Sequence, residues 1–119
     1  MAKGHKQLMN TLSSLWWMSQ RGWLLATPAG KVQTPGGGWM TLAPEGTSDM
    51  CGYELIDGKP IACFIEVKTI NDSVKTKQKQ FLEERAMHGC KTYICKPNSK
   101  GQLTLRIYPY QNGQKEILL

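Results

Sequence analysis

The order of apolar and polar residues divides the chain into short segments of helix and strand. Residues 6–21 carry apolar side chains at helical spacing, and Gly22 follows as the expected end of this helix. The next stretch, "WLLATPAGKVQTPGGGWMTLAPEGTSD", is rich in Gly, Pro and Thr. There we expect one or two short strands, around residues 23–26 and 38–42, joined by a mobile "TPGGG" loop.

The second half of the chain has clearer signals. "MCGYELI" and "IACFIEVKT" read as strands separated by a turn, "DGKP". "SVKTKQKQFLEERAMHG" reads as a helix, with Ser73 as the expected N-cap and Gly89 at its end. "KTYIC" and "LTLRIYPY" are two further strands. The order helix, strands, helix, strand, strand predicts an α/β fold with a mixed sheet flanked by helices.

Charged residues interrupt the most apolar of these strands. Glu66 and Lys68 lie within "CFIEVKT", where an ionised side chain costs several kcal/mol, by order of magnitude, unless it is paired or bound to an ion. Side chains alternate along a strand, so Glu66 and Lys68 share one face. The sequence therefore raises the question of what these two charges do inside a sheet.

The preceding strand brings a second carboxylate to the same place. If the turn uses only "DG", Asp49 lies opposite Glu66. If the loop takes in all of "DGKP", Asp49 lies opposite Lys68. We expect the longer loop to form more easily, because Pro60 cannot donate a hydrogen bond to a ladder. Both registers put Asp49, Glu66 and Lys68 on one face.

This combination of residue types indicates a site. Carboxylates are hard oxygen ligands suited to Mg²⁺, and Lys68 could orient or deprotonate a water molecule or neutralise a phosphate. A structural ion pair is the alternative interpretation. On the following helix, Gln78 shares a face with Phe81 and Leu82, which should dock on the sheet and direct Gln78 towards the carboxylates.

Composition and charge restrict the choice of partners. The 119 residues suit a single domain, 1–119, and the formal charge of +6 favours polyanions such as nucleic acid. No apolar run reaches the ~20 residues of a membrane helix, and "MAKGHKQLMN" lacks the apolar core of a signal peptide, so we expect a cytoplasmic protein without membrane contact. The four cysteines have no metal or redox spacing and are expected to be buried as small apolar residues.

Three motifs in order carry a family resemblance. "GTSD", then "FIEVK", then "QKQFLEERAMHG" resembles the VRR-NUC family of the PD-(D/E)xK nuclease superfamily. The resemblance implies a restriction-endonuclease-like core. It also implies that Asp49 and Glu66 bind a metal ion with help from the Val67 carbonyl, that Lys68 is the catalytic lysine, and that Gln78 lines the site.

The sequence departs from the family pattern at two points. Ser48 stands where the superfamily motif has proline, which the VRR-NUC family tolerates. The family often has a glutamate in the first helix that joins the metal site, and the corresponding region here, "GHKQL", has none. The candidates to replace it are His5, Gln7 and Glu45.

Together these features predict a divalent-metal-dependent DNA endonuclease that uses Mg²⁺ or Mn²⁺. The resemblance to free-standing phage-type members implies branched DNA, such as four-way junctions, as substrate. Cutting a junction symmetrically requires a homodimer, for which "LSSLWWM" is the expected interface. Lys75 and Lys79 should contact the DNA backbone, unless they merely solvate their helix. The alternative function is a DNA-binding module with weakened or lost catalysis.

Overall fold

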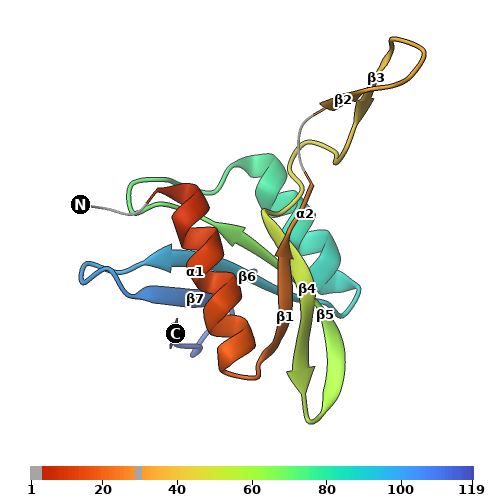
Figure 1. Ribbon diagram of the computed structural model, residues 1–119. Coiled ribbons are helices and arrows are strands. Elements are labelled where there is room, and N and C mark those ends of the chain that lie inside the picture. The colour runs from red at the N-terminus through yellow and green to blue at the C-terminus, as the bar shows by residue number, and fades with distance from the viewer. Residues whose placement is uncertain (1–3, 29–30) are drawn as a thin grey trace.

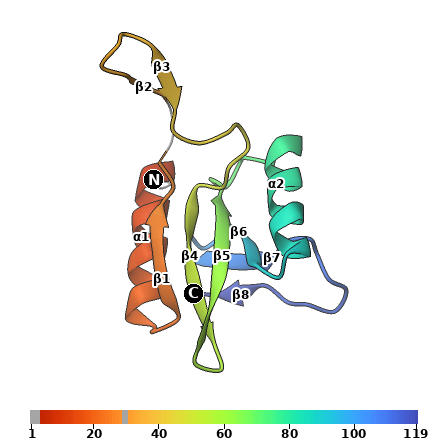
Figure 2. The same ribbon diagram turned by 90° about the vertical axis from the view of Figure 1, so that its right-hand side faces the viewer.

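The protein folds around one six-stranded sheet with a helix on each face. The computed structural model describes residues 4–28 and 31–119; residues 1–3, at the start of the segment that lacks a signal peptide's apolar core, lie outside them. Helix α1 (His5–Met18) and helix α2 (Thr76–Met87) pack on opposite faces of the sheet (Figures 1 and 2). The predicted α/β class with a mixed, helix-flanked sheet is confirmed.

The sheet has the strand order β1-β4-β5-β6-β7-β8. Its strands are β1 (Gly22–Ala26), β4 (Met50–Ile56), β5 (Lys59–Val67), β6 (Lys91–Pro97), β7 (Leu103–Ile107) and β8 (Ile117–Leu118). Only β5 and β6 run parallel, and α2 is the crossover that joins them; the other neighbours are antiparallel. The sequence patterns did not predict β8.

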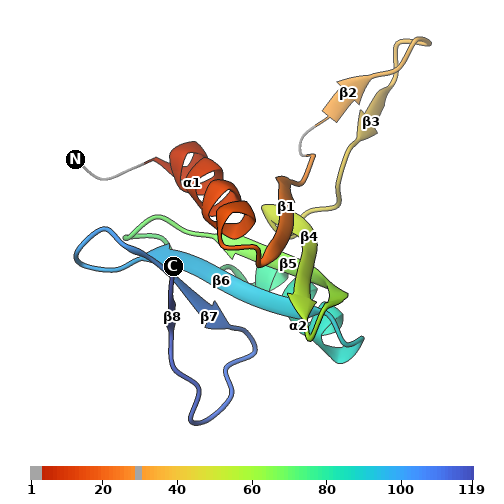
Figure 3. The same ribbon diagram turned by 60° about the horizontal axis from the view of Figure 1, so that its bottom comes forward.

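A separate two-stranded hairpin projects from the body of the protein. It pairs β2 (Lys31–Gln33) with β3 (Trp39–Thr41) and stands well away from both helices (Figures 1 and 3). The "TPGGG" segment closes this hairpin, with the Thr34 amide donating to the Gly38 carbonyl at 2.7 Å. The expectation that "TPGGG" joins strands at 23–26 and 38–42 was therefore wrong, because the strand at 23–26 pairs with β4 instead.

Helix α1 closes the core on one face of the sheet. Leu8, Leu12 and Trp16 recur every fourth residue, so they line one side of the helix and are buried. The core that they join is contributed by all the longer strands: Leu24, Met50, Cys63, Ile65, Val67, Tyr93, Cys95, Leu103 and Leu105. Cys63 and Cys95 thus behave as the small apolar residues predicted, while Cys51 and Cys90 are half-buried and also free.

The sequence pattern suggested that Gly22 ends α1, but the helix ends before this residue. The helix ends at Met18, and Gln20 takes the left-handed conformation with φ 58°. Gly22 is instead the first residue of β1, where a Cβ atom would lie 2.1 Å from the Tyr53 carbonyl oxygen. The glycine is required by this close approach of two main chains.

The β4–β5 turn has the shorter of the two loops considered. Asp57 and Gly58 both have positive φ, 52° and 78°, and Ile56 pairs with Lys59. The expectation that the longer loop forms more easily was wrong. Pro60 faces Leu55 at a non-hydrogen-bonded position of the hairpin, so its nitrogen points away from β4, and β6 begins to pair only at Cys63.

Helix α2 begins later than predicted. Its N-cap is Lys75 rather than Ser73, and the Gln78 side-chain oxygen accepts the Lys75 amide at 2.9 Å. Gly89, at φ 87°, follows the C-cap as expected. Leu82 is buried, and Phe81 meets Phe64 of β5 edge-on, with ring centroids 5.6 Å apart. This docking fixes the face on which Gln78 lies.

A polar network inside the core had no counterpart in the sequence interpretation. Buried Glu54 on β4 accepts hydrogen bonds from Arg21 at 2.9 Å and from the Tyr93 hydroxyl. Because the two carboxylate oxygens are both used, the buried charge is compensated. The network ties the turn after α1 to the centre of the sheet.

Neither helix has the dimensions that a bilayer requires. Across residues 4–28 and 31–119, no helix is both long enough and apolar enough to span a membrane.

Candidate active site

The predicted site residues meet at one end of the sheet. Asp49 directly precedes β4, while Glu66 and Val67 are the last residues of β5 and Lys68 follows them. The N-terminal ends of both helices lie at this same end (Figures 1 and 2). Two strands and two helices therefore meet at the site predicted for Asp49, Glu66 and Lys68.

Asp49 is fixed by the main chain of its neighbours. Its Oδ2 atom accepts the Val67 amide at 2.9 Å, and its carbonyl accepts the Thr27 amide at 2.8 Å. The observed register pairs Met50 with Ile65, so Asp49 stands opposite Glu66, as the shorter-loop alternative predicted. The family resemblance assigned the Val67 carbonyl to the metal. This carbonyl and the Asp49 carboxylate both contact His5, so the two groups lie close together.

The two oxygen atoms of the buried Glu66 carboxylate have different environments. Only 1% of the residue is exposed. Its Oε1 atom accepts Gln78 Nε2 at 3.2 Å and lies 3.7 Å from Lys68 Nζ. Its Oε2 atom is also buried but has no hydrogen-bond partner among the described residues. A structural Glu66–Lys68 ion pair alone leaves half of this carboxylate uncompensated.

The environment of Glu66 strongly disfavours its charge. Burial, followed by the proximity of the Asp49 carboxylate and repulsion from it, raises the pKa of Glu66 to about 9. Lys68 acts in the opposite direction and lowers this pKa, but it does not offset the other causes. Glu66 is therefore protonated near neutral pH in the absence of a cation.

Gln78 is oriented at both ends of its amide. The oxygen accepts the Lys75 amide at the start of α2, and the nitrogen donates to Glu66. The helix cap and the site thus use the same side chain. The prediction that docking of Phe81 and Leu82 directs Gln78 to the carboxylates is supported by this contact.

A pocket lined by three basic residues and by two acids, Asp72 and Glu116, opens beside Lys68. It has a volume of about 340 Å³, and its lining includes Lys68, Ser73, Val74, Lys96 and Arg106. Arg106 is paired with Glu116 at 2.7 Å, whereas Lys96 Nζ donates to the Asp72 carbonyl. Sequence analysis missed Lys96, because this residue comes close to Lys68 only through the parallel pairing of β6 with β5.

His5 lies in the first helix, in the region where the family often has a glutamate and this sequence has none. Its Nε2 atom is 3.1 Å from Asp49 Oδ2 and 3.0 Å from the Val67 carbonyl oxygen. The other two candidates lie elsewhere: Gln7 accepts the Gly4 amide at 3.4 Å, and Glu45 pairs with Lys77 at 2.8 Å. Of the three, His5 is the residue that contacts the predicted site.

The lysines at the start of α2 lie beside the site. Lys75 and Lys79 are exposed, and Lys77 is held by Glu45. The helix begins at Thr76, so Ser73 and Val74 do not lie in its first turn. Those two residues line the pocket beside Lys68 instead.

The donor set fits a hard divalent cation. Two adjacent carboxylates, one with an unpartnered buried oxygen, offer negative charge that the described part of the protein leaves uncompensated. In the part of the chain that the structure describes, no three His, Cys, Asp or Glu side chains are grouped to hold a metal ion. The two carboxylates of Asp49 and Glu66 are compatible with Mg²⁺, which commonly binds through one or two carboxylates and keeps several waters.

A mixed sheet flanked by helices, with Asp49, Glu66 and Lys68 at one end, is compatible with a restriction-endonuclease-like core. Residues 43–98, which contain β4, β5, α2 and β6, match the family model described as the VRR-NUC domain. This match covers a little less than half of the chain, agrees with the resemblance and indicates a nuclease, which implies DNA as the substrate. No curated protein matches the chain.

Proposed function

We propose that the protein is a divalent-metal-dependent DNA endonuclease that hydrolyses phosphodiester bonds. The observation that carries this proposal is the unpartnered, buried Oε2 atom of Glu66 beside the carboxylate of Asp49. Two acids brought together without a cation destabilise the fold, so their retention inside a nuclease domain supports a catalytic use. The proposal goes beyond the family match, which indicates a nuclease in general.

Each site residue has a role that follows from its contacts. Asp49 and Glu66 would hold Mg²⁺ or Mn²⁺, together with the Val67 carbonyl. When bound, the ion supplies Lewis acidity towards phosphate oxygens and lowers the pKa of water in the site. Lys68, 3.7 Å from Glu66, orients or deprotonates the attacking water or neutralises the phosphate. Gln78 holds Glu66 in place.

Activity assays of matched variants test this function. Glu66→Gln and Lys68→Ala are each expected to lower cleavage by about a hundredfold or more while circular dichroism shows an intact fold. Glu84→Gln, at an exposed acid on α2, should cleave like the wild type. Chelator should abolish cleavage, and Mg²⁺ or Mn²⁺ should restore it. Wild-type cleavage by both site variants, or full activity in chelator, contradicts the proposal.

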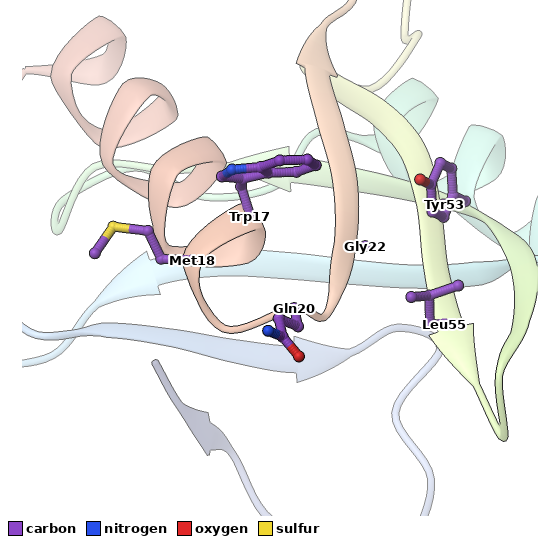
Figure 4. A pocket seen from close by; sticks show the side chains of 6 residues that line it. All are labelled: Trp17, Met18, Gln20, Gly22, Tyr53 and Leu55. Carbon is purple, nitrogen blue, oxygen red and sulfur yellow. The ribbon is translucent and has the colours of Figure 1, made fainter.

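The proposed substrate is branched DNA, such as a four-way junction, cut by a homodimer. An apolar patch at the end of the molecule opposite the active site supports dimer formation. It surrounds a pocket of about 680 Å³ and contains Trp17 and Met18 of α1 with Tyr53 and Leu55 of β4 (Figure 4). The pocket has no charged lining residue among those that the structure describes, so it suits a second copy better than it suits DNA.

The competing function is a DNA-binding module without catalysis. It is favoured by one observation: α1 brings His5 rather than an acid to the site. A metal-dependent nicking assay on a four-way junction, a flap and a plain duplex separates the two functions. Cleavage of any of these substrates rejects the pure binding module, and the order of preference identifies the DNA structure that is cut.

A further inference from the structure

The β2–β3 hairpin is an arm attached at the border of the active site. Within the described residues its strands pair only with each other, and it projects beyond the end of the sheet that carries Asp49 (Figures 1 and 2). A two-stranded hairpin alone is marginally stable in water. At its base, a pocket of about 380 Å³ is lined by His5, Thr27, Ala43 and Asp49, among others. The arm therefore starts and ends next to the candidate catalytic residues.

The arm presents a large aromatic side chain to solvent. Trp39 is 67% exposed, and its neighbours Met40 and Leu42 are exposed as well. The segment from residue 31 to residue 44 contains one lysine and no acid, so it repels no phosphate. An exposed Trp on an uncharged to basic arm is a suitable surface for stacking a nucleobase.

The tip of the arm allows a nucleic acid strand to approach closely. Pro35 and three glycines form the turn, and a Cβ atom at Gly36 or Gly37 would meet nothing within 4 Å. The turn is nevertheless held by main-chain hydrogen bonds between Thr34 and both Gly37 and Gly38. Trp39 directly follows this ordered turn, on the strand that leads back to Asp49.

We propose that Trp39 stacks on an unpaired or unstacked base of the DNA substrate, on the side of the active site from which the arm projects. This inference rests on the proposed nuclease function and deepens it, because it gives a physical basis for a preference for branched DNA. Bases in an intact duplex are already stacked, whereas those at a junction or fork are free to stack on protein. The arm thus reads DNA structure, and the carboxylate site acts on the phosphate.

Binding measurements in chelator test the proposal without requiring cleavage. Trp39→Ala is expected to weaken binding to a fork with unpaired arms by about fivefold or more, and to leave plain-duplex binding nearly unchanged. Trp39→Phe should restore most of the affinity. Tyr110→Ala, at an aromatic residue 60% exposed in the β7–β8 connection, is the matched control and should bind like the wild type. A fluorescent base analogue at the fork should be quenched by the wild type and not by Trp39→Ala.

Two outcomes overturn the proposal: Trp39→Ala that binds the fork like the wild type, or equal decreases in affinity for fork and duplex. Thermal unfolding of each variant should match the wild type, because Trp39 is exposed. These results are independent of the Glu66 assay. A failed nuclease function appears as unaltered cleavage in Glu66→Gln, whereas a failed arm contact appears as unaltered fork binding in Trp39→Ala.

Discussion

At the scale of single residues, His5 gives Asp49 a different neighbour from the glutamate that the family often has in the first helix. A histidine N–H donates to oxygen acceptors, so His5 binds the Asp49 carboxylate and the Val67 carbonyl together from the first turn of α1. An acid at the same position would add a further carboxyl group beside Asp49 and Glu66, whose proximity already disfavours the charge on Glu66. His5 therefore acts as a positioning residue for the site, with a different charge from the glutamate that the family often has there.

We expect His5→Ala to lower metal affinity and cleavage by about tenfold or more, because groups that orient metal ligands have effects of this size. Isothermal titration with Mn²⁺ provides a readout independent of activity. Gln7→Ala, an exposed neighbour on the same helical turn, serves as the control and should leave both quantities unchanged. His5→Ala with wild-type metal affinity would show that His5 only packs at the helix end.

The raised pKa of Glu66 predicts a specific pH dependence of stability. In the unfolded chain this carboxyl ionises near its ordinary value of 4.5, whereas in the folded, metal-free protein its pKa is about 9. Between these values the folded state binds more protons, so the free energy of unfolding falls as pH rises. In chelator, the melting temperature should drop by several degrees more in the wild type than in Glu66→Gln between pH 5 and pH 9. Parallel curves for the two proteins would contradict the assignment.

At the scale of elements, helix α2 both contributes a side chain to the candidate active site and carries a basic surface. Its first turn supplies Gln78 to Glu66, and the exposed Lys75 and Lys79 flank that residue at i−3 and i+1. Lys77 is already paired with Glu45. The same helix end can therefore hold the DNA backbone while its inner face orients the carboxylate.

The double variant Lys75→Ala, Lys79→Ala should bind DNA of every sequence more weakly. The slope of log affinity against log salt should become shallower by about two units, one for each phosphate that no longer has a lysine beside it. Cleavage at saturating DNA should change little, unlike that of Glu66→Gln. Lys59→Ala, Lys115→Ala removes the same charge from exposed positions outside the site and is the control. An unaltered salt slope in the α2 variant would assign these lysines to solvation alone.

At the scale of the whole molecule, the β2–β3 arm and the apolar patch lie at opposite ends. The arm and the active site share one end, and the patch around Trp17 occupies the other (Figures 1 and 4). A two-fold dimer formed through the patch would thus place its two active sites facing away from the interface. This arrangement suits two cuts on separate arms of a branched substrate.

Trp17→Glu is expected to shift the protein from dimer to monomer, because it places a charge in the centre of the proposed interface. Trp17 is 66% exposed, so the monomer should keep its fold. Analytical ultracentrifugation of the wild type and the variant checks this. A wild type that sediments as a monomer at working concentrations would reject the homodimer, and the junction preference would then require another explanation.

The sequence alone determined the parts that depend on local periodicity. Alternation along "CFIEVKT" placed Glu66 and Lys68 on one face, and either turn length brought Asp49 to them, because a shift by two residues preserves the face of a strand. Helical spacing likewise identified the docking face of α2 and with it Gln78. These predictions needed no knowledge of how distant segments pack.

Only the tertiary structure decided what depends on contacts between distant segments. His5 reaches Asp49 and Val67 because α1 crosses the sheet at that end, and nothing in its local sequence indicates this. Lys96 joins the site because β6 runs parallel to β5, and Gly22 is required by the Tyr53 main chain rather than by the end of a helix. Local pattern fixes which face a side chain takes, but packing alone fixes which other segment that face meets.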